Sequence, residues 1–134
     1  MSQKNVEIVR RFMRRFVEQE VEAALQDVDP EAELDWSNSD APDSGRYKGH
    51  AGWRAFVQAR DAALVRRGFE LAEMTAPKPE QVLVVGRMSE RGRASGVEVA
   101  SQGAAVFTLR EGKIVRIKVY QTSDQAHQAL GLNG

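Results

Sequence analysis

The sequence predicts an α+β domain in which helices pack on one face of a curved, mostly antiparallel sheet. Two observations predict this class. Apolar residues recur at helical spacing in the first half of the chain, and long segments of strand character, separated by turn clusters, fill residues 69–121. The chain has 134 residues, of which 42% are hydrophobic, so we expect one domain over residues 1–134.

Three helices are expected before the long strands. The first covers residues 3–22, where apolar side chains recur every three or four residues. The second covers residues 21–28 and ends at Asp29-Pro30, because a residue before proline is pushed out of the helical region. The third covers residues 50–67, on a stripe that includes Trp53, Phe56 and Arg60, and Gly68 is expected to end it.

The expected strands begin with a short segment at residues 33–37, followed by a turn-rich loop at residues 38–45. Four longer strands are expected at residues 69–75, 81–89, 97–109 and 114–121. The turn clusters between them are APKPE, ERGRASG and REGK. A short C-terminal helix at residues 122–132 completes the chain, with Thr122 or Ser123 as its N-cap.

Composition excludes several classes of function. Nineteen basic and nineteen acidic residues give a net charge of zero, which argues against nucleic acid as a partner. The chain has no cysteine and two separated histidines, so we expect no metal site and no cofactor. No apolar stretch approaches the roughly 20 residues that cross a bilayer. We expect no membrane association and, because the first residues lack an apolar signal core, a cytoplasmic location.

Three segments carry a resemblance to a known superfamily. They are VDPEAELDWSNSDAPDSGRYKGHAGWRAF, RGRASGVEV and VFTLREGKIVRIKVYQTSDQAHQALGL. In order and spacing they resemble the nuclear-transport-factor-2-like (NTF2-like) superfamily, especially its SnoaL-like and ketosteroid-isomerase-like members. The resemblance implies a cone-shaped roll with a deep pocket, built from three N-terminal helices on the curved sheet and a short C-terminal helix. It also implies a homodimer formed through the outer sheet face.

The resemblance leaves catalysis open. The position that matches the base carboxylate of ketosteroid isomerases holds Trp36, with Asp35 beside it pointing the other way. The positions that match their two oxyanion donors hold Phe16 and Ala105. All three isomerase groups are therefore missing at the matched positions.

Ten residues are expected to line a ligand pocket. Aromatic side chains would form a wall for a flat ligand, with Trp36 equally suited to pocket or core and Phe56 favouring the core. Gln121, in phase with Ile117 and Val119, is expected to point inward as a hydrogen-bonding group. The expected ligand-binding residues are Phe16, Trp36, Tyr47, Trp53, Phe56, Ala105, Phe107, Ile117, Val119 and Gln121.

Two residues are candidate bases. Asp40 lies with Asp35 and Asp43 near the predicted pocket mouth, and His50 begins the third helix. Aspartates in turn-rich loops more often bond their own backbone, and a histidine at a helix start is more often an exposed residue. Both readings stay open.

The sequence therefore predicts a protein that binds a small apolar or aromatic cyclic ligand and, if it is an enzyme, performs cofactor-free proton-transfer chemistry. Tyr47 or Gln121 would then donate a hydrogen bond. The alternative is a non-catalytic ligand-binding or homodimerisation module. The loss of the three isomerase groups motivates that alternative.

Overall fold

The computed structural model describes residues 2–38 and 44–131. The helices are α1 (Ser2–Val17), α2 (Val21–Leu25), α3 (Gly49–Ala63) and α4 (Ser123–Ala129). The strands are β1 (Val28–Asp35), β2 (Arg46–Lys48), β3 (Leu64–Lys78), β4 (Gln81–Gly92), β5 (Glu98–Arg110) and β6 (Lys113–Tyr120). Within the described residues, no helix is long and apolar enough to cross a membrane.

One sheet of six strands, in the order β2-β1-β6-β5-β4-β3, forms the centre of the fold. All neighbouring strands are antiparallel except β1 and β6, which run parallel. The predicted meander of four long strands is confirmed as β3–β6. Because β1 and β6 are parallel, the sheet is mixed. Parallel neighbours need a long connection, and here α3 and the strands β3–β5 provide it.

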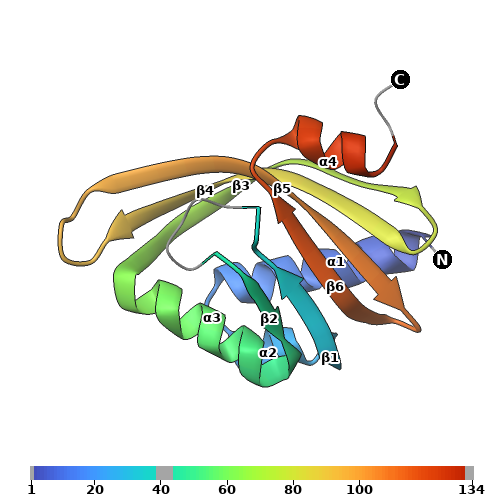
Figure 1. The fold of residues 1–134 in the computed structure, drawn as a ribbon, viewed down its shortest axis with the longest axis horizontal. Coiled ribbons are helices and arrows are strands. Elements are labelled where there is room, and N and C mark those ends of the chain that lie inside the picture. Colours follow the sequence, from blue (N-terminus) through green and yellow to red (C-terminus); the bar gives the residue numbers. More distant parts are fainter. Residues whose placement is uncertain (1, 39–43, 132–134) are drawn as a thin grey trace.

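The helices divide between the two faces of the sheet, as Figure 1 shows. Helices α1, α2 and α3 cover the concave face, where they share one apolar core with β1, β4, β5 and β6. Helix α4 lies on the opposite face, which we call the outer face, over a smaller cluster that includes Leu83, Val106 and Leu130. The predicted α+β cone fold is thus confirmed.

The sheet bends along a line that crosses three strands. Leu71 in β3 is opposite Gly86 in β4, and Gly86 is opposite Gly103 in β5. The β3–β4 register shifts between Leu71 and Glu73, which marks a β-bulge. Bulges and glycines are the features that let a sheet curve. A side chain at Gly86 would collide with the ring of Phe69, so this position requires the close approach that glycine permits.

Several predicted boundaries differ from the structure, including the end of the first helix at Val17, and two of the differences affect the sheet. The third helix ends at Ala63 and not at residue 67, and the chain is already extended at Leu64, where β3 begins. Leu64 and Val65 are drawn into the sheet because they pair with Gly92 and Arg91 across the β3–β4 hairpin.

The second difference lies at the start of β1. Val28 begins the strand and does not end α2, and Pro30 lies inside β1. The strand accepts this proline because the β1–β6 register is irregular between Val28 and Glu33, so a backbone donor is not needed there.

Candidate functional site

An aromatic cluster lies on the concave side, at the end of β1. Trp36 follows β1, Tyr47 lies in β2, and Phe56 lies in α3. The ring centres of Trp36 and Phe56 are 5.9 Å apart, and those of Tyr47 and Phe56 are 5.0 Å apart, both in edge-on geometry. The backbone N–H of Trp36 donates to the carbonyl of Gly45 at 2.7 Å, which anchors the strand end that carries the indole.

The sequence-predicted pocket residues divide into a buried group and a partly exposed group. Trp53, Phe56, Phe107 and Ile117 are buried in the core, and the indole N–H of Trp53 donates to the carbonyl of Ala32 at 3.2 Å. The partly buried residues that pack against this core include Phe16, Trp36, Tyr47, Ala105 and Val119. Only the second group exposes surface that a ligand could contact.

Arg60 and Glu90 form an ion pair beside this cluster, and sequence reasoning missed it. Nη2 of Arg60 in α3 lies 2.9 Å and 3.1 Å from the two carboxylate oxygens of Glu90 in β4. The guanidinium carbon lies 5.4 Å from the ring centre of Trp36 and 5.7 Å from that of Phe56. These distances place a cation over aromatic faces, which stabilises both. The sequence feature that could have indicated this pair is Arg60 itself, because a charged residue on the apolar stripe of a helix needs a partner.

The structure describes only one of the two predicted bases. Asp40 and Asp43 lie outside the part of the chain that the structure describes. His50 begins α3, and its Nε2 lies 2.8 Å from the carbonyl oxygen of Val28. Val28 begins β1 whereas Trp36 follows its last residue, a separation of roughly 25 Å along an extended strand. His50 is therefore at the other end of β1 from the aromatic cluster.

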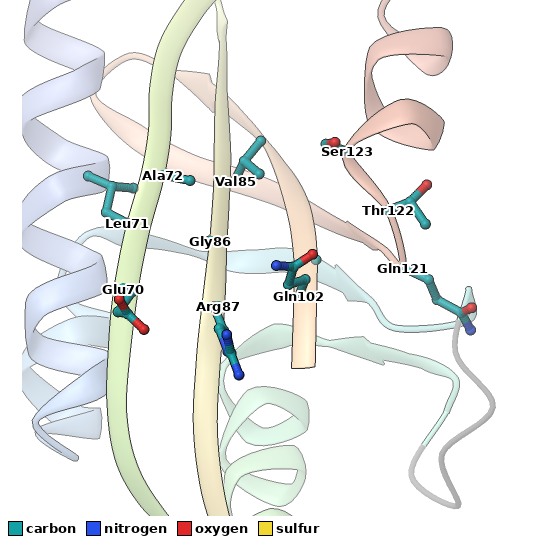
Figure 2. A pocket seen from close by; sticks show the side chains of 11 residues that line it. Glu70, Leu71, Ala72, Val85, Gly86, Arg87, Gln102, Gln121, Thr122 and Ser123 are labelled. Atoms are coloured by element: carbon teal, nitrogen blue, oxygen red, sulfur yellow. The ribbon is translucent and has the colours of Figure 1, made fainter. Parts of the chain in front are cut away.

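A groove of about 520 Å³ lies on the outer face, between the bend of the sheet and the start of α4 (Figure 2). Such a volume falls in the range of small-molecule sites. Its lining residues come from β3, β4, β5 and the segment after β6; they are Glu70, Leu71, Ala72, Val85, Gly86, Arg87, Gln102, Gly103, Gln121, Thr122 and Ser123.

Gln121 belongs to this outer groove. Its side chain is exposed, and its backbone N–H donates to the side-chain oxygen of Gln125 at 3.1 Å. The strand ends at Tyr120, so the alternation that would point Gln121 inward stops one residue earlier. The predicted inward position of Gln121 is corrected by this arrangement. Arg87 also lines the outer groove and is exposed.

Asp35 is fully buried on the outer side of β1. Its Oδ1 accepts hydrogen bonds from the backbone N–H and hydroxyl of Ser37, at 3.0 and 2.5 Å. Its Oδ2 lies 3.2 Å from Nη2 of Arg116, 3.5 Å from Nε of Arg46 and 3.8 Å from Nζ of Lys118. Burial alone would raise the pKa of Asp35, but the Ser37 hydrogen bonds and the charges of Lys118 and Arg46 outweigh it and lower that pKa.

Metal ligands do not gather in the described part of the chain. Over residues 2–38 and 44–131, no three histidine, aspartate or glutamate side chains lie close enough to hold one ion. Beside the aromatic cluster, Glu90, Arg60, Tyr47 and Trp36 offer a carboxylate, a guanidinium, a phenol and an indole.

Solved structures with the same fold include proteins of several descriptions. An NTF2-like protein from Burkholderia xenovorans LB400 is 24% identical, with a TM-score of 0.78 over 96% of this chain and 97% of that one. A protein proposed to be a polyketide cyclase, from Xanthomonas campestris pv. campestris, is 16% identical, with a TM-score of 0.74 over 93% and 95%. TerC, crystallised with polyporic acid, is 21% identical, with a TM-score of 0.74 over 96% and 98%. These likenesses show a shared fold.

Sequence comparison is more specific at the family level. No curated protein matches the chain. The family model of the SnoaL-like domain, in contrast, matches residues 9–117, from α1 through most of β6. The match includes the aromatic cluster and the Arg60–Glu90 pair. The chain therefore belongs to the SnoaL-like domain family, within the NTF2-like fold.

Proposed function

We propose that this protein binds a small, flat, apolar cyclic ligand on the concave side of its sheet, against Trp36 and Tyr47. The observation that carries the proposal is that the partly exposed rings of Trp36 and Tyr47 contact buried Phe56, with the charge of Arg60 over the Trp36 ring. Aromatic walls with few polar groups are typical of sites for cyclic ligands. TerC, which has the same fold, was co-crystallised with a small molecule, polyporic acid.

The chemistry we propose for this site is proton transfer next to a carbonyl group, carried out by side chains without a metal or organic cofactor. The sequence proposes Asp40 or His50 as the base and Tyr47 as a hydrogen-bond donor. Of these, Tyr47 lies in the aromatic cluster, whereas His50 begins α3 at the other end of β1. The double variant Asp40→Asn/His50→Ala tests the two bases together. Full activity in that variant would exclude both.

The binding proposal is tested by isothermal titration calorimetry with 2-tetralone, a bicyclic aromatic ketone. Because Tyr47 would supply one wall, Tyr47→Ala should weaken binding by about tenfold or more. The matched control is Gln102→Ala, which removes a side chain from the outer groove and should leave the dissociation constant unchanged. If Gln102→Ala loses binding and Tyr47→Ala does not, the ligand binds in the outer groove and not on the concave side.

A second candidate function is a homodimerisation or non-catalytic binding module that uses the outer face. It is favoured by the groove and by Leu71, which is 44% exposed there. Arg116, Lys118 and Tyr120 of β6 are further candidates for dimer contacts on this face. Arg116 and Lys118 pair with Asp35 of their own chain, so apolar surface beside the groove is the better candidate contact.

A further inference from the structure

We propose that Glu90 accepts a proton from the ligand and that Arg60 stabilises the oxyanion that this transfer creates. The inference rests on the proposed function, because it assigns the chemistry to a pair beside the proposed ligand surface. It names the substrate class as a cyclic carbonyl compound with an acidic hydrogen next to the carbonyl.

Arg60 and Glu90 are both largely shielded from solvent. The side chain of Glu90 is 6% exposed and that of Arg60 is 21% exposed. A carboxylate so deeply buried requires a charged or hydrogen-bonding partner, and Arg60 supplies it. Buried charge pairs are weak contributors to stability, so the fold gains little from a pair at this position. Because the pair lies beside the partly exposed Trp36 ring, it is placed to act on a ligand there.

The Arg60–Glu90 pair lies next to the proposed ligand surface. Arg60 links Glu90 to the aromatic cluster, because the same guanidinium contacts the carboxylate and lies over the Trp36 and Phe56 rings. A flat ligand against Trp36 would therefore have the guanidinium N–H groups within reach of its carbonyl. It would also lie near the Glu90 carboxylate, which the same guanidinium holds.

On the sheet, Glu90 has an exposed apolar neighbour. Val99 in β5 is directly opposite Glu90 in the β4–β5 register, so their side chains lie on the same face of the sheet. Val99 is 47% exposed although it is apolar. An uncovered apolar surface therefore adjoins the buried carboxylate, which suits a ring system that carries a carbonyl group.

The proposed step balances without an oxidant or cofactor. The C–H bond next to the ligand carbonyl breaks, and its proton forms an O–H bond with a carboxylate oxygen of Glu90. The electron pair of the C–H bond moves into the carbonyl group, and the negative charge on oxygen is met by Arg60. The guanidinium N–H groups of Arg60 would stabilise this enolate by charge and hydrogen bonding. Return of the proton to the same or another carbon completes an exchange or an isomerisation.

The test measures hydrogen–deuterium exchange of 2-tetralone in D₂O by proton NMR, corrected for the uncatalysed rate. General base catalysis contributes a factor of about 10² to 10⁴, so Glu90→Gln should lower the protein-dependent rate at least 100-fold. Glu90→Asp should keep part of that rate, and Arg60→Met should lower it by tenfold or more. The matched control is Glu98→Gln, an exposed carboxylate on the same hairpin, which should leave the rate unchanged.

The outcomes separate this assignment from the proposed function. Absence of 2-tetralone binding to the wild-type protein would count against the proposed function itself. Binding without exchange, or equal exchange in Glu90→Gln and wild type, would overturn the role of Glu90 and leave binding intact. Thermal unfolding of each variant checks that it is folded. If Glu90→Gln is unfolded, the exchange rate of Arg60→Met relative to that of the wild type tests the assignment instead. A ratio near one would overturn the assignment.

Discussion

Asp35 and Trp36 are neighbours in the chain, but their side chains serve opposite faces of the sheet. Trp36 packs against the concave core, whereas Asp35 is buried on the outer side among Arg116, Arg46 and Lys118. The two hydrogen bonds from Ser37 to Asp35 fix the chain on both sides of Trp36. We therefore interpret Asp35 as a residue that holds the indole in place from behind.

The first prediction concerns the stability that Asp35 contributes. Because Asp35 is fully buried but its cationic partners are partly exposed, Asp35→Asn should lower the free energy of unfolding at pH 7 by about 1–2 kcal/mol. Glu31→Gln, an exposed carboxylate on the same strand, should change it by less than about 0.5 kcal/mol. Urea unfolding followed by circular dichroism measures both.

The pH dependence of this effect has a defined sign. The pKa of Asp35 is lowered in the folded state from its ordinary value of 3.8, so its contribution is fully present above that value. The contribution is lost as pH falls through the lower folded pKa. The stability difference between wild type and Asp35→Asn should therefore shrink below about pH 4. A difference that grows on acidification would contradict the ionised state of Asp35.

At the residue scale, the sequence could identify Trp36, Tyr47 and Phe56 as a group, because they lie within 21 positions and flank one loop. It could not identify the Arg60–Glu90 pair. Those residues are 30 positions apart, and Glu90 lies in a segment that reads as a turn. Only the antiparallel return of β4 beside α3 brings the carboxylate to the arginine.

At the scale of elements, the bend of the sheet determines how the long strands reach the helices. Gly86 lies on the line where β3 has its bulge, and the ring of Phe69 lies directly over it. The bend lets the far end of β4 bring Glu90 to Arg60 on the side of α3. The same curvature leaves the outer groove open beside α4.

The second prediction tests this bend with two glycines of the same sheet. A methyl group at Gly86 would collide with the Phe69 ring and lie 2.7 Å from the carbonyl oxygen of Glu70. Gly86→Ala should therefore lower the free energy of unfolding by about 1–3 kcal/mol. At Gly68 nothing lies within 4 Å of such a methyl group, so Gly68→Ala should be neutral or slightly stabilising. Equal effects of the two substitutions in thermal unfolding would show that the bend does not need glycine.

The boundary between α3 and β3 shows where elements cannot be predicted from local pattern alone. Leu64 fits the helical stripe of α3, and Gly68 is a plausible helix stop. The strand nevertheless begins at Leu64, because β4 extends to Gly92 and pairs with it. Long hairpins can thus convert the last turn of a helix pattern into strand.

At the scale of the whole molecule, the sheet presents two different surfaces. The concave side carries the aromatic cluster and the ion pair, and the outer side carries the groove and α4. Small-molecule chemistry and self-association can therefore use separate faces. The family resemblance predicted both the cone-shaped fold and a homodimer. The cone-shaped fold is confirmed, and the homodimer stays a prediction.

The third prediction concerns association through the outer face. If two copies meet there, the protein should sediment as a dimer at micromolar concentration. Ala72→Arg would place a charge in the groove and should shift the protein toward monomer, whereas Ala62→Arg on exposed α3 surface should not. Sedimentation equilibrium at several concentrations measures both variants. A protein that stays monomeric at the highest concentrations would contradict dimerisation through the outer face.

The most direct test of the central claim is a tryptophan-fluorescence titration with 2-tetralone. Trp53 is 3% exposed and bonded to Ala32, whereas Trp36 lies at the proposed ligand surface, so Trp36 should report the binding. We expect saturable quenching that persists in Trp53→Phe and disappears in Trp36→Phe. Quenching that persists in Trp36→Phe, or a response that never saturates, would contradict a ligand site on the concave side.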